Sequence, residues 1–245
     1  MKKGQKLFIW GIGIALIGSL FLLERSSRLL LSCHFGVKKI EVKGSHRINN
    51  RQILEAASIP LDAPILKLDL KEIAQRVESH PWIRSCDVRR VLPNKLLLRI
   101  VERRPIALIY LGKLYYVDED GTPFKEPSPG ETLDYPVLTG WERRRWKKGE
   151  GKESIQEALR LLREVQKYPH LSQERISEIY LNEIAELIIF TSRRGTMINL
   201  GRGDAGLKLK RLEEVWKRIT TKHVPVNYIL CEYPDRIVVG LEERG

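Results

Sequence analysis

The sequence predicts an α+β protein: an N-terminal transmembrane helix, then a β-α-α-β-β unit, then a mostly antiparallel β-domain with helices. Three observations lead to this fold class. An uncharged apolar run opens the chain, strand-like and helix-like periodicities alternate from residue 37 to 104, and short alternating runs separated by turns follow from 105 to 245. With 42% hydrophobic and 30% charged residues, the 245-residue chain has ordinary globular composition.

The apolar run is LFIWGIGIALIGSLFLL, from Leu7 to Leu23, and three lysines precede it. It has the length of a short membrane-spanning helix, which needs about 17–25 residues. A cleaved signal peptide usually has an apolar core of about 7–15 residues followed by a small-x-small site, and here charged residues follow instead. Charged residues also separate the run from Leu31-Ser32-Cys33, a candidate lipoprotein-processing site. We therefore expect an uncleaved anchor.

The orientation of this anchor is weakly specified, because basic residues lie on both of its sides: Lys2, Lys3 and Lys6 before it, and Arg25, Arg28, Lys38 and Lys39 after it. Long downstream domains can cross a membrane despite their charges. We therefore expect residues 1–6 to form a cytoplasmic tail, 7–23 the transmembrane helix and 24–36 a juxtamembrane linker. The expected topology is single-pass type II in the cell (inner) membrane, with the bulk of the chain periplasmic or extracytoplasmic.

The net charge of +12 and the pI near 9.7 would suit nucleic acid, anionic lipid or another acidic polymer. The densest basic run is WERRRWKKGEGK, from Trp141 to Lys152, in which Trp141 and Trp146 are interleaved. Basic residues with aromatics can bind single-stranded nucleic acid, but a domain outside the cytoplasm meets none. Anionic lipid or wall polymer stays open as a ligand, and a solvated surface loop is the favoured interpretation.

No residue pattern proposes catalysis, a cofactor or a metal. The three cysteines, Cys33, Cys86 and Cys231, form no CxxC pair, and we expect the last two to be small core residues. The five histidines are scattered without metal-ligand spacing. The acids from Asp118 to Asp120 run into Gly121 and indicate a hairpin turn. We expect no enzyme activity, no cofactor, no small-molecule substrate and no nucleic acid.

A literal G-x-G-x-x-G, at Gly201, Gly203 and Gly206, raises the alternative of a dinucleotide-binding enzyme. The motif stands between the strand-like TMINL and a helix, and the next strand, VNYILCE, ends in Glu232, as in a Rossmann unit. A phosphate-binding strand, however, is expected to open its domain, and few residues follow here. The favoured interpretation is that these glycines permit tight backbone geometry between strand and helix.

The first unit after the anchor has the order β-α-α-β-β. VKKIEVKG, from Val37 to Gly44, alternates like a strand. Asn49 or Asn50 caps a helix to about Ser58 with Ile53, Leu54 and Ala57 inward, and Asp69 caps a second helix with Leu70, Ile73, Ala74 and Val77 at helical spacing. WIRSCDVRRV and KLLLRIVERR, joined at Leu92-Pro93-Asn94, are two further strands, and we expect Trp82 in the core.

The second unit begins with IALIYLGKLYYVDEDGTPF, whose alternating runs predict successive antiparallel strands. An apolar helical stripe at Ile155–Val165 follows, then three strands in EIYLNEIAELIIFTSRRGTMINL. A helix from Leu207 to Ile219 packs the stripe Leu212, Val215, Trp216 and Ile219 on the sheet. Two last strands are expected at Val226–Glu232 and Arg236–Leu241, and the last would be a free edge.

The string HPWIRSCDVRRVLPNKLLLRIVERRPIALI, following IEVKGSHRINNRQILEAASIPLDAPILKLDL, resembles the FtsQ-type POTRA domain. The arrangement of basic tail, anchor, POTRA domain (37–104) and β-rich domain (105–245) ending in VNYILCEYPDRIVVGL is similar to the FtsQ/DivIB family of bacterial cell-division proteins. This resemblance implies a non-enzymatic divisome scaffold at the division septum, which links division proteins and coordinates septum formation.

The resemblance also implies that the last strand docks partners of the FtsB and FtsL type by main-chain pairing. The implied partner-binding residues are Tyr233 at the turn, Asp235 and Arg236 entering the strand, Ile237, Val238 and Val239 within it, and Leu241 near its end. The family often has a larger aromatic where Leu241 stands. An open edge of the POTRA sheet is a second candidate docking surface. The alternative function is a single-POTRA protein for secretion or envelope assembly, although the chain has one POTRA copy and no room for a barrel.

Overall fold

The computed structural model describes residues 35–141, 151–201, 205–233 and 235–241. The predicted tail and anchor, the linker up to residue 34, Gly203 and most of the basic run lie outside these residues. Within the described ranges, no helix combines the length and the apolar character needed to cross a membrane. The chain divides into two compact units, Met1–Arg103 and Arg104–Gly245.

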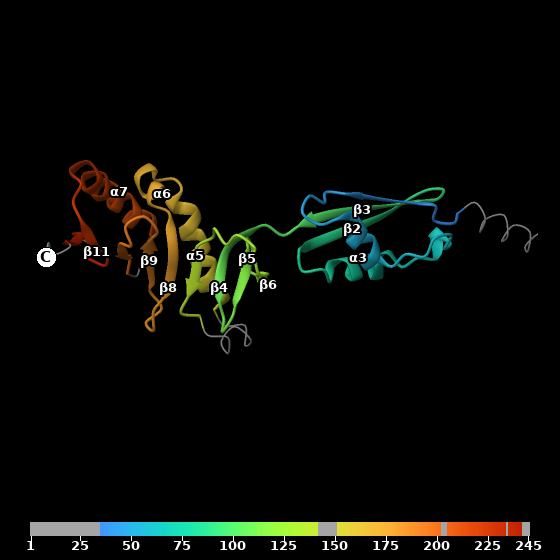
Figure 1. The fold of residues 1–245 in the computed structure, drawn as a ribbon, viewed down its shortest axis with the longest axis horizontal. Coiled ribbons are helices and arrows are strands. Elements are labelled where there is room, and N and C mark those ends of the chain that lie inside the picture. Colours follow the sequence, from blue (N-terminus) through green and yellow to red (C-terminus); the bar gives the residue numbers. More distant parts are fainter. Residues whose placement is uncertain (1–34, 142–150, 202–204, 234, 242–245) are drawn as a thin grey trace, which may run out of the picture. The chain divides into compact units, whose positions relative to one another are not determined.

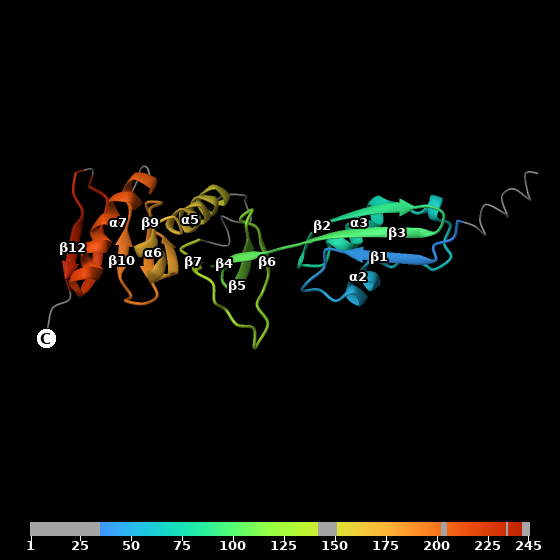
Figure 2. The same ribbon diagram turned by 90° about the horizontal axis from the view of Figure 1, so that it is seen from above.

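The first unit is a three-stranded sheet with two helices, as the periodicities predicted. Its strands lie in the order β1-β3-β2, with β1 parallel and β2 antiparallel to β3, and Figure 2 shows them side by side. The elements in chain order are β1 (Lys39–Lys43), α2 (Asn50–Ala57), the 3-10 turn η1 (Ile65–Lys67), α3 (Leu70–Glu78), β2 (Ile83–Val91) and β3 (Lys95–Glu102). Strands β1 and β2 are therefore the two edges of this sheet.

Both helices of the first unit begin at the predicted caps. The side chain of Asn49 accepts a hydrogen bond from the Arg51 N–H, and that of Asp69 accepts from the N–H groups of Lys71 and Glu72. These oxygens satisfy backbone donors that have no partner within the helix. The α+β reading of this unit is thereby confirmed from its local signals.

The core of the first unit contains most of the residues expected there. Trp82 is 7% exposed, and Ile53, Ala57, Ile73 and Val77 are buried. The expectation for Leu54 was wrong, because its side chain is 37% exposed. It stands one residue after Ile53, so the helical rotation turns it off the face that meets the sheet.

The second unit is built on one nine-stranded sheet, in the order β12-β11-β10-β9-β8-β7-β4-β5-β6. Its strands are β4 (Pro105–Tyr110), β5 (Leu114–Asp118), β6 (Pro123–Lys125), β7 (Val137–Thr139), β8 (Ile176–Leu181), β9 (Leu187–Thr191), β10 (Met197–Asn199), β11 (Val226–Leu230) and β12 (Val238–Leu241). Its helices are α5 (Lys152–Val165), α6 (Pro169–Glu174) and α7 (Ala205–Lys222).

Most neighbouring strands of this sheet are antiparallel, as expected, including the β4-β5-β6 series. Three pairs are parallel: β4 with β7, β7 with β8, and β10 with β11. All three pairs need crossover connections: the one from β4 to β7 contains β5 and β6, the one from β7 to β8 contains α5 and α6, and the one from β10 to β11 contains α7. The sheet is thus mixed, with two β-α-β connections among its hairpins.

One face of the sheet packs against the helices (Figure 1). Leu212, Trp216 and Ile219 of α7 are buried with Ile198 of β10 and Ile229 of β11, which confirms the predicted packing stripe. Since side chains alternate along a strand, the neighbours of these strand residues point to the opposite face.

On the opposite face, side chains of the chain itself cover β5 at Tyr116. There Tyr116 is 1% exposed, with Phe124 and Tyr135 each 5.9 Å from it between ring centroids. The predicted turn follows β5: the Asp118 carboxylate accepts from the N–H groups of Asp120 and Thr122. Cys86 and Cys231 are buried and unpaired, as expected of small core residues.

Candidate docking edge of the second sheet

Strand β12 lies at one end of the nine-stranded sheet and pairs with β11 alone among the described residues (Figure 2). The pairing is antiparallel, with Leu230 opposite Val238, Ile229 opposite Val239, and Val226 opposite Leu241. A strand paired on one side presents backbone N–H and C=O groups on the other. These groups can accept a further strand, whose alternate side chains would lie on the two faces of the sheet.

The turn into β12 brings together two of the expected residues. The guanidinium carbon of Arg236 lies 5.2 Å from the ring centroid of Tyr233, within the range of a cation–π contact. Tyr233 is 37% exposed, and Asp235 and Arg236 are exposed too. A cation, a carboxylate and an aromatic ring are therefore all accessible beside the first residue of the edge.

The strand itself is shorter than expected, because it begins at Val238 and not at Arg236. Ile237 precedes the strand, half-buried, and packs with Val239 against the helix-covered core. These two side chains hold the edge to the sheet, whereas Val238 lies on the opposite face. Main-chain pairing by a partner would therefore involve Val238–Leu241.

Leu241 stands at the far end of β12 from Tyr233 and is 58% exposed. The two ends of β12, Val238 and Leu241, are roughly 10 Å apart, because a strand rises about 3.4 Å per residue. The structure thus does not gather the seven expected residues into one cluster. It distributes them as a polar and aromatic start, an apolar strand and an exposed leucine at the end.

Sequence reasoning missed one residue of this edge, Tyr228, which pairs with Gly240 across β11 and β12. A Cβ built on Gly240 would lie 2.2 Å from Cε1 of the Tyr228 ring, so the ring occupies the side-chain position that glycine leaves empty. An isolated glycine in a strand pattern is a sequence signal for such a close approach. The sequence does not show which residue approaches this glycine, because that depends on the register between β11 and β12.

The glycine-rich stretch has a structural role in the described residues. Gly201 has φ +61°, and a Cβ there would lie 2.7 Å from Cβ of Glu232. The Lys208 ammonium donates to the Leu200 carbonyl oxygen at the start of α7. The backbone and Cβ of Glu232, the acid that a dinucleotide site would use to hold a ribose, lie directly beside this first glycine. Gly203 lies outside the described residues.

The described part of the chain contains no cluster of His, Cys, Asp or Glu that could hold a metal ion. Two hollows, of about 440 and 410 Å³, lie beside α5 and are lined by mixed apolar and charged side chains. The expected residues lie instead along β12 and the turn that precedes it.

Together, the small β-α-α-β-β unit and the long mixed sheet define an α+β protein of two units, whose first unit has the strand and helix order expected of a POTRA domain. Residues 35–103 match the FtsQ-type POTRA domain, and residues 107–229 match the C-terminal domain of cell division protein FtsQ/DivIB. The chain belongs to the FtsQ/DivIB family of cell division proteins.

Individual relatives agree with this assignment. The chain is 33% identical to cell division protein FtsQ of Syntrophotalea carbinolica, over 87% of this chain and 77% of the relative. It is 32% identical to FtsQ of Geotalea daltonii, over 84% of this chain and 75% of the relative, and 38% identical to FtsQ of an Anaeromyxobacter species, over 73% and 61%. The predicted family is confirmed, and so is the predicted succession of a POTRA domain and a large β-sheet.

Proposed function

We propose that this chain is a non-enzymatic divisome scaffold that recruits and links division proteins outside the cytoplasmic membrane by β-strand addition, and so coordinates septum formation. The observation that carries the proposal is the position of β12, which ends the sheet and pairs on one side only among the described residues. Membership in a family of cell division proteins supplies the cellular process.

Strand addition suits this edge for a physical reason. An incoming strand would pair with the free backbone groups of Val238–Leu241, which gives affinity that depends little on sequence. Specificity would come from the ends of the edge, where Tyr233, Asp235 and Arg236 are exposed on one side and Leu241 on the other. A partner with a strand flanked by charge at one end and an apolar residue at the other fits these features.

The proposed partners are proteins of the FtsB and FtsL type. The proposed location is the cell (inner) membrane at the division septum, with a single-pass type II anchor at residues 7–23 and residues 37–104 and 105–245 as extracytoplasmic domains. Anchoring the chain and its partners in one membrane would raise their effective concentration, so a short edge can suffice for stable docking. The scaffold would need neither cofactor nor small-molecule substrate.

The test is site-specific photocrosslinking of the full-length chain in membranes of its native host. A photoreactive residue replaces Arg236, and matched probes replace Lys222, exposed at the end of α7, and Lys39, at the start of the edge strand β1. Mass spectrometry identifies each adduct. We expect Arg236 to capture a small single-pass coiled-coil division protein that Lys222 does not capture.

Two results would contradict the proposal. Equal capture of that protein at Lys222 would show proximity without docking at β12. Capture of an exported or outer-membrane protein at Lys39, with no adduct at Arg236, would favour the alternative of a single-POTRA protein for secretion or envelope assembly. Titration of the chain with nucleotides, followed by intrinsic fluorescence, tests the enzyme alternative, for which we expect no saturable signal.

A further inference from the structure

The Tyr228 ring lies across the backbone of the edge strand. Carbons Cε1, Cζ and Cδ1 of this ring would stand 2.2, 2.4 and 2.6 Å from a Cβ on Gly240. No real Cβ approaches carbon atoms so closely, and therefore the ring position requires glycine. An aromatic side chain that covers a glycine on the neighbouring strand is a known device for stabilising edge strands.

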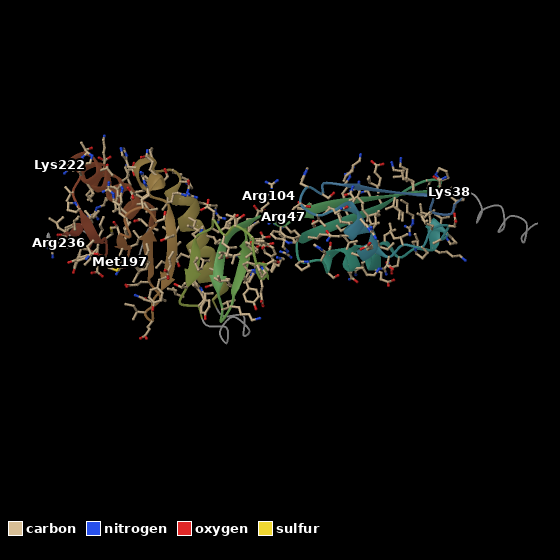
Figure 3. The ribbon with its side chains drawn as sticks, viewed as in Figure 1. Lys38, Arg47, Arg104, Met197, Lys222 and Arg236 are labelled. Atoms are coloured by element: carbon tan, nitrogen blue, oxygen red, sulfur yellow. The ribbon has the colours of Figure 1, made fainter. Side chains whose placement is uncertain are left out.

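The Tyr228 ring lies on the face of the sheet that the helices leave uncovered. The next residue along β11, Ile229, and its partner Val239 pack in the helix-covered core, so Tyr228 and Gly240 point the other way. Met197 on β10 stands opposite Tyr228 and also points to this face, away from Lys222 at the end of α7 (Figure 3).

A row of apolar side chains leads across this face to the edge. Phe190 on β9 pairs with Met197, Met197 with Tyr228, and Tyr228 with Gly240. Phe190 and Met197 are half-buried, and Tyr228 is 37% exposed. The row stops at a residue without a side chain, so the Tyr228 ring is the last side chain of this row before the edge.

We infer that the Tyr228 ring over Gly240 forms a seat for one large apolar side chain of the strand that docks on β12. This inference rests on the proposed function and adds the chemistry of one partner position. The occupant is the partner residue directly opposite Gly240, on the face away from the helices. The partner residues two positions before and after this one lie on the same face. They are about 7–8 Å from Gly240 along the diagonal and meet the ring less closely.

Glycine at position 240 makes this seat possible in two ways. It lets the Tyr228 ring reach over β12, and it removes the side chain that would otherwise stand between the ring and an incoming strand. A cross-strand contact normally joins adjacent strands. Here the contact would join β11 to the partner across β12, and it would fix the partner's register because a one-residue slip moves the apolar side chain to the other face.

The first experiment places a photoreactive phenylalanine analogue at Tyr228 of the full-length chain in native-host membranes. Matched probes replace Asn227, the exposed neighbour on β11, and Leu207, which is 65% exposed on α7. We expect the Tyr228 probe to capture the protein that an Arg236 probe captures, with the attachment mapped to an apolar residue of a strand. The Leu207 probe should not capture it.

The second experiment compares Tyr228→Phe with Tyr228→Ser, each carrying the Arg236 probe. Loss of an aromatic pair weakens docking by about 3- to 10-fold, so the serine variant should lower the adduct yield at subsaturating partner expression while the phenylalanine variant keeps it. Circular dichroism and thermal unfolding confirm that both variants are folded. A double variant, Tyr228→Ser with Gly240→Thr, refills the uncovered face without restoring the ring and should stay weak.

The outcomes separate the seat from the docking edge. If Arg236 captures the partner, but Tyr228→Ser and Tyr228→Phe give equal yields or the Tyr228 probe gives no adduct with it, the seat is wrong and strand addition stands. If the double variant regains the wild-type yield, any side chain on this face suffices and the aromatic seat is wrong. If Arg236 captures no division partner in the unmodified chain, the proposed function fails and the seat with it.

Discussion

The carboxylate of Glu102 accepts two hydrogen bonds from the backbone N–H of Arg47, at 3.0 and 3.1 Å. The N–H groups of His46 and Ile48 donate to the same carboxylate, each at 3.0 Å. Glu102 at the end of β3 thus holds the segment that leads from β1 to α2. Partial burial would raise the pKa of Glu102, but these backbone hydrogen bonds outweigh it and hold the pKa below its usual value.

Replacement of this carboxylate should loosen the segment from His46 to Ile48. Glu102→Gln removes the charge that three N–H groups share, and we expect a loss of about 1–3 kcal/mol in the local free energy of opening. Hydrogen–deuterium exchange of residues 46–48 in the full-length chain measures it. Glu55→Gln is the control, because Glu55 makes an exposed ion pair with Arg51 that contributes less than about 1 kcal/mol. Equal exchange in the two variants would contradict this role for Glu102.

Gly140 should tolerate alanine worse than Gly112, although both have positive φ, +88° and +85°. A Cβ on Gly140 would lie 2.0 Å from the Leu181 carbonyl oxygen, whereas nothing lies within 4 Å of one on Gly112. Both variants incur the left-handed backbone strain of about 1–2 kcal/mol, and Gly140→Ala adds about 1–3 kcal/mol for the steric overlap. Thermal unfolding of the two variants compares these effects. A smaller loss for Gly140→Ala than for Gly112→Ala would contradict the prediction.

The stability of the segment 126–136, which is joined to Tyr116 through Glu131, should depend on pH. The Ser128 N–H, the Tyr116 hydroxyl at 2.8 Å and the Lys125 ammonium hold the pKa of Glu131 at about 2, below its usual value of 4.5. Because the folded pKa is the lower one, this stabilisation is complete above pH 4.5 and is lost as the pH falls toward 2.

The measurement is hydrogen exchange of residues 126–136 between pH 5 and 2.5, corrected for intrinsic rates. We expect opening to become easier in the wild type as the pH falls, and to change less in Glu131→Gln, which has no carboxylate to titrate at this position. Other acids of the chain titrate in the same window, so the difference between the two proteins is the observable. Parallel curves for both would rule out Glu131 as the cause.

Leu241 should matter for docking more than for folding. Its side chain is 58% exposed, so Leu241→Ala should change the free energy of unfolding by less than about 0.5 kcal/mol. Full burial of an exposed leucine contributes about 1.5–3 kcal/mol, and a partner can bury at most the exposed 58% of this side chain, so the same variant should weaken partner capture by about 4- to 20-fold. Adduct yield from the Arg236 probe measures this, with Leu207→Ala, 65% exposed on α7, as the control. Unchanged yield in Leu241→Ala would exclude this side chain from the interface.

Local signals in the sequence predicted the local structure well. Asn49 and Asp69 could be identified as caps because a cap and its helix are neighbours in the chain. The hairpins after residue 105 were predictable because alternation and turn residues are adjacent in sequence. The family resemblance placed the expected docking residues on a terminal strand, and in the structure that strand lies at the end of the sheet and begins two residues later than expected.

Features that join distant segments could not be predicted from these signals. Strand β7 lies between β4 and β8. Its pairing with β8 spans the α5 and α6 connection, and the three residues Val137–Thr139 carry no local signal that predicts this partner. The contact of Tyr228 with Gly240 depends on a register that a bulge between Val226 and Tyr228 shifts. Leu54 was misplaced because Ile53, Leu54 and Ala57 together span a wide part of the α2 surface. Which part of that surface is buried depends on how the helix packs against the sheet.

In the part of the chain that the structure describes, β12 has one neighbouring strand, and this affects the energetics of the whole second unit. A strand held along one side opens at a free energy below that of global unfolding, so β12 and the turn before it should form the least protected cooperative segment of the sheet. A ligand that binds only the closed form multiplies the ratio of closed to open β12 by one plus the ligand concentration divided by its dissociation constant. A bound partner strand would therefore slow amide hydrogen exchange in β11 and β12. The local opening of the native state would then measure how much of the edge is occupied.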